Sequence, residues 1–323
     1  MATINRALFV FVIALIIRSG YVWFFIEVDN LILEDQMMYI QLGKTIAEIG
    51  DFLQVTNNGY TAITDRVLGY PTLLAAVYTL FGESNMAVVI VQIIIDSLTC
   101  VVIALIAESV IKGGFIVAGI VSALNLNMII LSGMILTDTL FLFIFSLFIL
   151  LVYRYIKYPN SFKLFLVVSV LCLSVLVRPV SYYLVFLLLP LLIGFFIWRR
   201  MLFKQVVYSL LLYMIPIVIA FGSIHHRNYY EYNSFSLTSQ GGGHALYWVV
   251  PATYQYSGQG SYQEGQALVK DRLKDAMQRD GYQMSTNNPF KISDYRMQVA
   301  KEALLDLGFL NMLHAWSVGT AIN

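Results

Sequence analysis

The sequence is short of charged residues and of cysteines, and each shortage excludes a class of protein. Only 12% of the 323 residues are Asp, Glu, Lys or Arg, whereas 59% are hydrophobic; soluble domains carry about 25% charged residues. Cys100 and Cys172 lie inside apolar runs, which indicates packing residues rather than a disulfide or metal pair. HExxH, GxSxG and P-loop patterns are missing, as are basic tracts interleaved with aromatics, so soluble-type hydrolase, nucleotide and nucleic-acid chemistry have no support.

Long apolar runs are abundant instead. A membrane-crossing helix needs about 20 mostly apolar residues. The first run follows a short start and lacks a small-residue cleavage site, so we expect a retained signal-anchor helix. The sequence predicts an all-α polytopic membrane protein with spans at about 7–26, 86–107, 114–133, 138–153, 163–180, 181–198 and 205–224.

The positions of Lys and Arg predict the orientation of these spans. Cytoplasmic loops carry an excess of basic residues. With Arg6 inside, every basic loop falls on the same side: Lys112, then Arg154, Lys157 and Lys163, then Arg199, Arg200 and Lys204. Acidic residues collect on the opposite side, including Glu34, Asp35, Glu48, Asp51, Asp65, Glu83 and Asp138. We therefore expect a multi-pass protein of a bacterial-type plasma membrane, with its working face outside.

Two regions are predicted to lie outside the spans. An outer loop at about 28–84 should hold a helix from 34 that stops at Gly50, and a short apolar helix at 70–82 that is re-entrant or lies on the surface. The predicted domains are a transmembrane domain, 1–227, and an extracytoplasmic segment, 228–323.

The extracytoplasmic segment is polar and is expected to contain a Gly-rich turn at 241–243 and helices at about 262–279 and 291–313. Residues 310–321 become apolar again. We expect that further chain, with further spans, belongs after this segment.

Two acids are candidate site residues. Asp35 begins the outer helix, and Tyr39 follows one turn later on the same face; the alternative is an acid that interacts with the helix dipole. Asp138 follows Thr137 at the outer start of the fourth span, where either residue could instead be an N-cap. Convergence of both acids on one cleft would favour the functional interpretation.

Two arginines are candidate anion contacts. Arg178 precedes Pro179 at the outer end of the fifth span, against the positive-inside bias, and is suited to grip a phosphate at headgroup depth. Its alternatives are snorkelling to the interface or pairing with Asp138. Arg66 is a second candidate contact for a phosphate or sugar, with a solvated loop residue as the alternative.

Other ionisable residues leave two interpretations open. Asp96 lies inside the second span, where an acid is a functional candidate by position; Gln92, one turn earlier, offers it a structural partner. His225, His226 and Arg227 could bind a metal or a phosphate at an outer interface, although adjacent histidines point to different faces of a helix.

Four segments carry a likeness to a known family: Asp35-Gln-Met-Met-Tyr39 with the helix after it, Arg66-Val-Leu-Gly-Tyr-Pro71, Thr137-Asp138, and Leu176-Val-Arg-Pro179. The segment Arg227-Asn228-Tyr229 adds to it. The chain resembles the polyprenyl-phosphate-sugar-dependent membrane glycosyltransferases of the GT-C fold, which include protein O-mannosyltransferases and lipid A aminoarabinose transferases. It departs from them at Gln36, where many relatives have a second acid, at Val67-Leu68, which replace prolines, and in being shorter.

The resemblance implies a GT-C-like helix bundle and inverting transfer of a sugar from a polyprenyl-phosphate donor to an extracytoplasmic protein, lipid or glycan. Asp35 would be the general base, Asp138 would orient the acceptor or hold a divalent metal ion together with Asp35, and Arg178 would stabilise the leaving phosphate. The remaining predicted substrate contacts are Arg66, Tyr39, Tyr70 and Arg227. No other cofactor is expected, and the bilayer is the expected surrounding.

Two functions from other classes compete with this one. A transporter or lipid flippase would use Asp96, Asp138 and Arg178 as a charge path, although no repeat relates the two halves of the chain. A polysaccharide polymerase or ligase would depend on His225, His226 or Arg227 rather than on Asp35.

Overall fold

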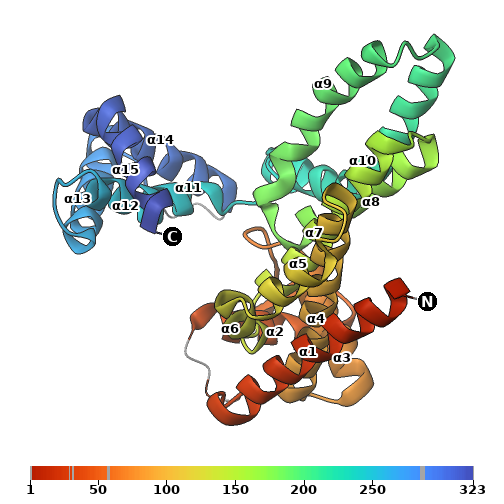
Figure 1. The fold of residues 1–323 in the computed structure, drawn as a ribbon. Coiled ribbons are helices and arrows are strands. Elements are labelled where there is room, and N and C mark those ends of the chain that lie inside the picture. Colours follow the sequence, from red (N-terminus) through yellow and green to blue (C-terminus); the bar gives the residue numbers. More distant parts are fainter. Residues whose placement is uncertain (1, 29, 31–32, 57–58, 284–287, 323) are drawn as a thin grey trace. The chain divides into compact units, whose positions relative to one another are not determined.

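The computed structural model describes residues 2–28, 30, 33–56, 59–283 and 288–322. Helices dominate, and one short antiparallel hairpin, which the sequence patterns did not predict, pairs β1 (Leu53–Thr56) with β2 (Gly59–Ala62). The chain divides into two compact units, one made of 1–63 with 67–222 and the other of 64–66 with 223–323. Each unit is described by itself below (Figure 1).

The first unit is built from apolar helices. They are α1 (Ala2–Phe25), α2 (Glu34–Ile49), α3 (Gly69–Phe81), α4 (Asn85–Val110), α5 (Phe115–Ala123), α6 (Leu126–Ser132), α7 (Asp138–Lys157), α8 (Ser161–Val177), the short 3-10 helix η1 (Pro179–Ser181), α9 (Tyr182–Trp198) and α10 (Phe203–Tyr232), whose C-terminal part belongs to the second unit. Among the residues that the structure describes, five helical stretches are long and apolar enough to cross a membrane, or six if the bent pair α5 and α6 forms one span. These are the lengths and compositions of an α-helical membrane protein.

Apolar helices occur at all seven predicted spans, but two of them differ from a simple crossing. The third is broken by 56° between α5 and α6, where the Asn125 side chain accepts a hydrogen bond from the Met128 amide (3.0 Å) and starts a new helix. The fifth, α8, has only 17 residues. Asn160 caps its start, and Pro179 disfavours helical backbone at the residue before it, which ends the helix.

The loop between α1 and α4 contains the two expected helices. The helix α2 ends at Gly50, which adopts left-handed backbone with φ 79°, and α3 ends at Gly82 with φ 74°. The two helices pack closely because residue 43 is glycine: a Cβ atom there would lie 2.6 Å from Leu74 Cβ. Both helix predictions are confirmed.

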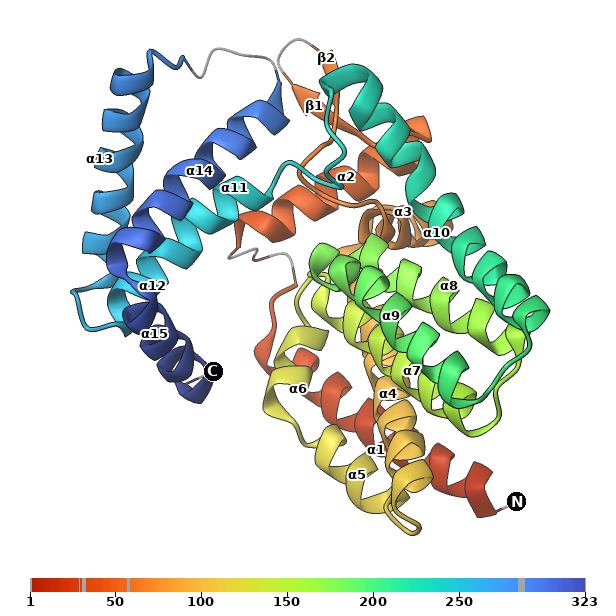
Figure 2. The ribbon, with the colours of Figure 1, turned by 90° about the horizontal axis from the view of Figure 1, so that it is seen from above.

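Hydrophobic clusters of described residues fill the interior of the first unit. One lies among α1, α4 and α5, which run side by side (Figure 2), and contains Val10, Ala14, Cys100, Ala104, Phe115 and Ala123. Another joins α3 and α4 to the ends of neighbouring elements through Tyr70, Leu74, Tyr78, Val89, Ile93, Ile135 and Val177. Cys100 and Cys172 are buried and free, as expected of packing residues.

The second unit is a small helical domain. Its helices are α11 (Gly241–His244), the π-helical turn η2 (Ala245–Val249), α12 (Val250–Tyr256), α13 (Tyr262–Asp280), α14 (Pro289–Leu307) and α15 (Phe309–Ile322). Leu246, Val250, Val269, Leu273, Val299, Ala300 and Ala303 form its core.

Two expectations for this unit were wrong. Residues 241–243 form a helix rather than a turn, because Gly242 lets α11 approach α14 so closely that a Cβ atom would overlap Ser293 O. The helix expected at 291–313 is two helices, separated at Gly308 by backbone with φ 84°.

Candidate functional site

An ion pair joins the ends of two helices of the first unit. Asp138 is the first residue of α7, and Arg178 follows the last residue of α8. The Arg178 guanidinium donates through NH1 to Asp138 Oδ1. The side chains remain 45% and 28% exposed, respectively. The pairing that the sequence left as an alternative for Arg178 is therefore present, and the guanidinium remains accessible.

Local backbone geometry explains why Arg178 lies outside its helix. Pro179 disfavours helical backbone at the preceding residue, and Arg178 is extended, with φ −147° and ψ 117°. The start of α3 lies against this turn, since a Cβ atom at Gly69 would come within 2.6 Å of Leu176 O. The N-terminus of α3 and the C-terminus of α8 thus meet beside the ion pair.

Tyr70 fixes this region to the core. Its side chain is fully buried, and its hydroxyl donates to Gln92 Oε1 at 2.6 Å. Gln92 in turn donates through Nε2 to the carbonyl oxygens of Ser132 (3.2 Å) and Met134 (2.8 Å). This buried chain of hydrogen bonds connects α3, α4 and the segment that leads into α7.

Tyr39 and Asp138 both lie close to Tyr70. The Tyr39 ring packs edge-on against the Tyr70 ring, with centroids 5.2 Å apart and planes at 89°. The pKa of Tyr70 is raised well above its ordinary value, first by burial and then by the charges of Tyr78, Tyr39 and Asp138. Ile135, three residues before Asp138, and Val177, next to Arg178, belong to the same hydrophobic cluster as Tyr70, which brings the ion pair into its neighbourhood.

Asp35 lies at the start of α2, one turn before Tyr39. Residues four apart share a helix face, so its exposed carboxylate is on the Tyr39 side of α2. The adjacent Gln36 is buried, and its Oε1 accepts a hydrogen bond from the Leu33 amide at 3.3 Å. Gln36 therefore secures the beginning of α2.

The predicted Arg66 and Arg227 belong to the second unit. Arg66 is 16% exposed and pairs with the adjacent Asp65 at 3.2 Å between NH1 and Oδ2. Arg227 donates to Asn228 Oδ1 from Nε (3.1 Å) and NH2 (3.0 Å). Asn228 is fully buried and donates to Ser236 O at 2.9 Å, which fixes the turn after α10.

The structure thus brings Tyr39, Tyr70, Asp138 and Arg178 together, with Asp35 one helical turn from Tyr39. A divalent metal fits this set poorly, because the Asp138 carboxylate is engaged by a cation. Among the described residues there is also no group of three or more His, Cys, Asp or Glu side chains arranged to hold a metal. The arrangement is better suited to binding an anion beside Arg178.

A second ion pair was missed by the sequence argument. Arg18 of α1 donates through Nε to Asp96 Oδ2 of α4, and the two side chains are 0% and 1% exposed. Of the two interpretations left open for Asp96, structural pairing is present, but its partner is Arg18 rather than Gln92, which binds Tyr70. The sequence did contain a signal for this pair: Arg18 lies inside one apolar run and Asp96 inside another, and ionisable residues within membrane spans tend to pair with one another.

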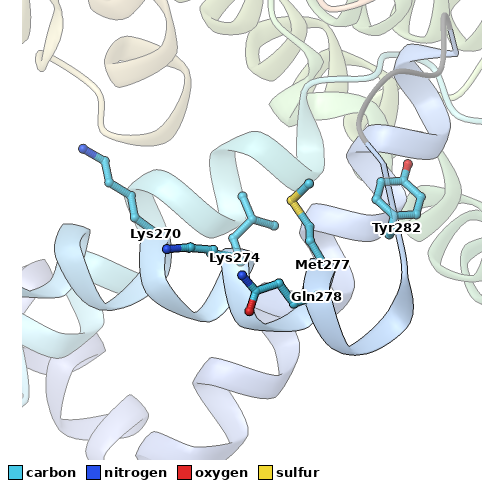
Figure 3. Close-up of a pocket in the computed structure, with 6 residues that line it drawn as sticks. Lys270, Lys274, Met277, Gln278 and Tyr282 are labelled. Carbon is cyan, nitrogen blue, oxygen red and sulfur yellow. The ribbon is translucent and has the colours of Figure 1, made fainter.

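The second unit carries a surface groove of about 370 Å³ along α13 (Figure 3). Its lining residues are Lys270, Leu273, Lys274, Met277, Gln278 and Tyr282. None of the site residues predicted from the sequence is among them.

Comparison of the chain with protein-family models, with curated proteins and with solved structures finds no match in any of the three. The function is therefore inferred from the residues and their geometry.

Proposed function

We propose that the protein is a membrane glycosyltransferase with a GT-C-like helix bundle. It would transfer a hexosyl or pentosyl group, with inversion, from a polyprenyl-phosphate-linked donor to an extracytoplasmic acceptor. The observation that carries the proposal is the accessible Arg178 guanidinium, held by Asp138 where two apolar helices end. The likeness of the segments around Asp35, Arg66, Asp138 and Arg178 to GT-C transferases also supports it.

Arg178 has the chemistry required to bind a lipid-linked phosphate. A guanidinium carries five N–H groups in a fork that matches phosphate oxygens. Asp138 orients this fork through NH1, and 45% of the side chain remains exposed. A polyprenyl phosphate would place its charge at the end of the span and its chain among the apolar helices. Arg178 is the residue expected to hold that charge.

Asp35 would supply the base. In a single displacement the acceptor oxygen or nitrogen attacks the anomeric carbon, the bond from that carbon to the phosphate oxygen breaks, and its electron pair stays on the phosphate. Asp35 accepts the proton of the acceptor, and Arg178 stabilises the charge that develops on the leaving phosphate. A general base contributes about 10²–10⁴ in rate, and one electrostatic donor about 10²–10³. Tyr39 would line the approach to these groups. Tyr70, predicted from the sequence as a substrate contact, is fully buried and instead supports the Tyr39 ring.

The charge distribution along α7 supports an extracytoplasmic site. Asp138 stands at the first position of the helix, whereas Arg154 and Lys157 occupy its last turn. Basic residues mark the cytoplasmic end of a span. The end that carries Asp138 and Arg178 would then face outside.

The rival charge path of a transporter has weaker support. It requires Asp96 to exchange protons or ions, but Asp96 is enclosed and paired with Arg18. A buried pair of this kind is better suited to holding helices together.

Sugar transfer from a set of radiolabelled polyprenyl-phosphate sugars, with membranes that contain the full chain, tests the proposal. The variants are Asp35→Asn, Arg178→Met and Arg178→Lys, with Glu48→Gln as a matched control because Glu48 is an exposed acid on the same helix, α2. We expect Asp35→Asn and Arg178→Met each to lose about 10²-fold or more in rate, Arg178→Lys to lose less, and Glu48→Gln to resemble the wild type.

Undiminished transfer by folded Asp35→Asn would reject Asp35 as the base. If the folded wild type transfers from no donor, the transferase proposal fails. A dependence of glycan polymerisation or ligation on His225, His226 or Arg227 would then favour the polymerase or ligase.

A further inference from the structure

The last helix of the second unit, α15, buries small residues and exposes large apolar ones, which is the opposite of a helix in a soluble domain. Its inward face consists of small residues: Ala315 is 4% exposed, and a Cβ atom at Gly319 would lie 3.5 Å from the Tyr256 ring. Its outward face carries large apolar side chains, namely Phe309 (72% exposed), Leu310 (77%), Leu313 (50%) and Trp316 (68%).

These side chains form a continuous stripe. Phe309, Leu313 and Trp316 recur at the four- and three-residue spacing of one helix face. Leu305, at the end of α14 and before the break at Gly308, is likewise 72% exposed. Residues Phe309–Ile322 contain no Asp, Glu, Lys or Arg. A contiguous exposed apolar surface of this kind marks an interaction site.

We infer that this stripe, formed by Leu305, Phe309, Leu310, Leu313 and Trp316, contacts lipid at the membrane–water boundary. The second unit is attached to a membrane span, because the C-terminal part of α10, a candidate span, belongs to it. The outward face also presents His314, Ser317 and Thr320. A mixture of Trp, large apolar residues and small polar residues is suited to the headgroup boundary rather than to the hydrocarbon centre.

The flank of the stripe is polar, as an interface helix requires. Asp306, next to Leu305, forms an ion pair with Arg272 of α13. Lys301, one turn earlier on α14, is exposed. The lipid contact is therefore expected to end between Lys301 and Leu305, and it holds whether or not the protein transfers sugars.

Spin labelling of the full chain in lipid nanodiscs tests this. In a Cys100→Ser, Cys172→Ala background, a nitroxide is attached at Leu313→Cys or Leu310→Cys, with Lys301→Cys as the matched control from the same unit. Collisions with oxygen, which enters lipid, and with a water-soluble nickel chelate are then measured. At 310 and 313 we expect severalfold fewer nickel collisions than at 301, together with more oxygen collisions.

Two results would overturn the lipid contact. Equal nickel accessibility at 301 and 313 would place the stripe in water. Loss of both oxygen and nickel collisions at 313 would show that protein, such as a second copy of the chain, covers it. Homogeneous particles and retained helical circular dichroism establish that each labelled variant is folded.

Discussion

Loss of one partner of the enclosed Arg18–Asp96 pair is predicted to destabilise the first unit strongly. Arg18 of α1 also donates from Nη1 to Ala123 O of α5 at 3.1 Å. Its Nη2 donates to Cys100 Sγ of α4 at 3.3 Å. Three helices therefore meet at one guanidinium. Neither charged side chain reaches solvent, so neither charge can be rehydrated without opening the helices.

Asp96→Asn removes the compensating charge and leaves the guanidinium enclosed. Breaking a buried pair in this way costs about 3–5 kcal/mol of unfolding free energy. The double variant Arg18→Met with Asp96→Leu removes both charges. It leaves the Ala123 carbonyl oxygen without this donor, whereas Ser122 O still accepts from the Asn125 amide at 3.2 Å. One unsatisfied buried group costs about 1–3 kcal/mol. The double variant should therefore be more stable than Asp96→Asn.

Reversible unfolding in mixed micelles, titrated with a denaturing detergent, measures these differences for the wild type, Asp96→Leu, Asp96→Asn, Arg18→Met and the double variant. We expect the destabilisation of the double variant to fall short of the sum of Arg18→Met and Asp96→Leu by about 2 kcal/mol or more, within the range of coupled neighbours. Two results would refute the argument that the pair is enclosed and coupled. One is a loss of unfolding free energy below about 1 kcal/mol for Asp96→Asn. The other is a destabilisation of the double variant equal to the sum of the two single variants.

Three further predictions concern packing, a buried hydrogen bond and pH. Gly242→Ala should destabilise the second unit by about 1–3 kcal/mol or more, because its Cβ atom would overlap the backbone of α14, whereas Gly243→Ala, which meets only the end of an Arg side chain, should cost less; thermal unfolding compares them. Tyr70→Phe leaves the buried Gln92 oxygen without its donor and should cost about 1–3 kcal/mol in the same assay. The pKa of Asp280 is lowered in the folded protein, first by a hydrogen bond from the adjacent Arg279. The ionised carboxylate should therefore stabilise the fold above the unfolded-state pKa, and this stabilisation should be lost as the pH falls through the folded-state pKa. The free energy of unfolding should consequently change less with pH for Asp280→Asn than for the wild type.

Local signals in the sequence were sufficient to predict most helices. The apolar run lengths located the helices of the first unit, and glycines at 50 and 82 marked the ends of α2 and α3 because each adopts backbone with positive φ. Ser261 with Glu264 forms a capping box at the start of α13, and the helix expected at 262–279 is present. These features depend on neighbours a few residues away, which a single sequence displays.

Features that depend on distant residues were not predictable in the same way. Arg18 and Asp96 are separated by 78 positions, so no local pattern links them. The helix at Gly241 contradicts the local preference of three glycines for a turn, because the close approach to Ser293 stabilises it. At the site, the sequence left pairing with Asp138 as one of several alternatives for Arg178, and only the folded chain shows that this pairing is present.

The Arg18–Asp96 and Arg178–Asp138 ion pairs of the first unit differ in exposure, and this difference separates their roles. The Arg18–Asp96 pair is sealed from solvent, so a ligand cannot reach it and its effect is confined to the packing of helices. The Arg178–Asp138 pair is 45% and 28% exposed, and a pair of that kind contributes only about 0–1 kcal/mol to stability. An incoming phosphate can therefore compete with Asp138 for the guanidinium at little cost to the fold. In the proposed transferase, Asp138 would serve as a resident anion that keeps Arg178 oriented until the donor binds, and the release of its carboxylate would make it available to the acceptor.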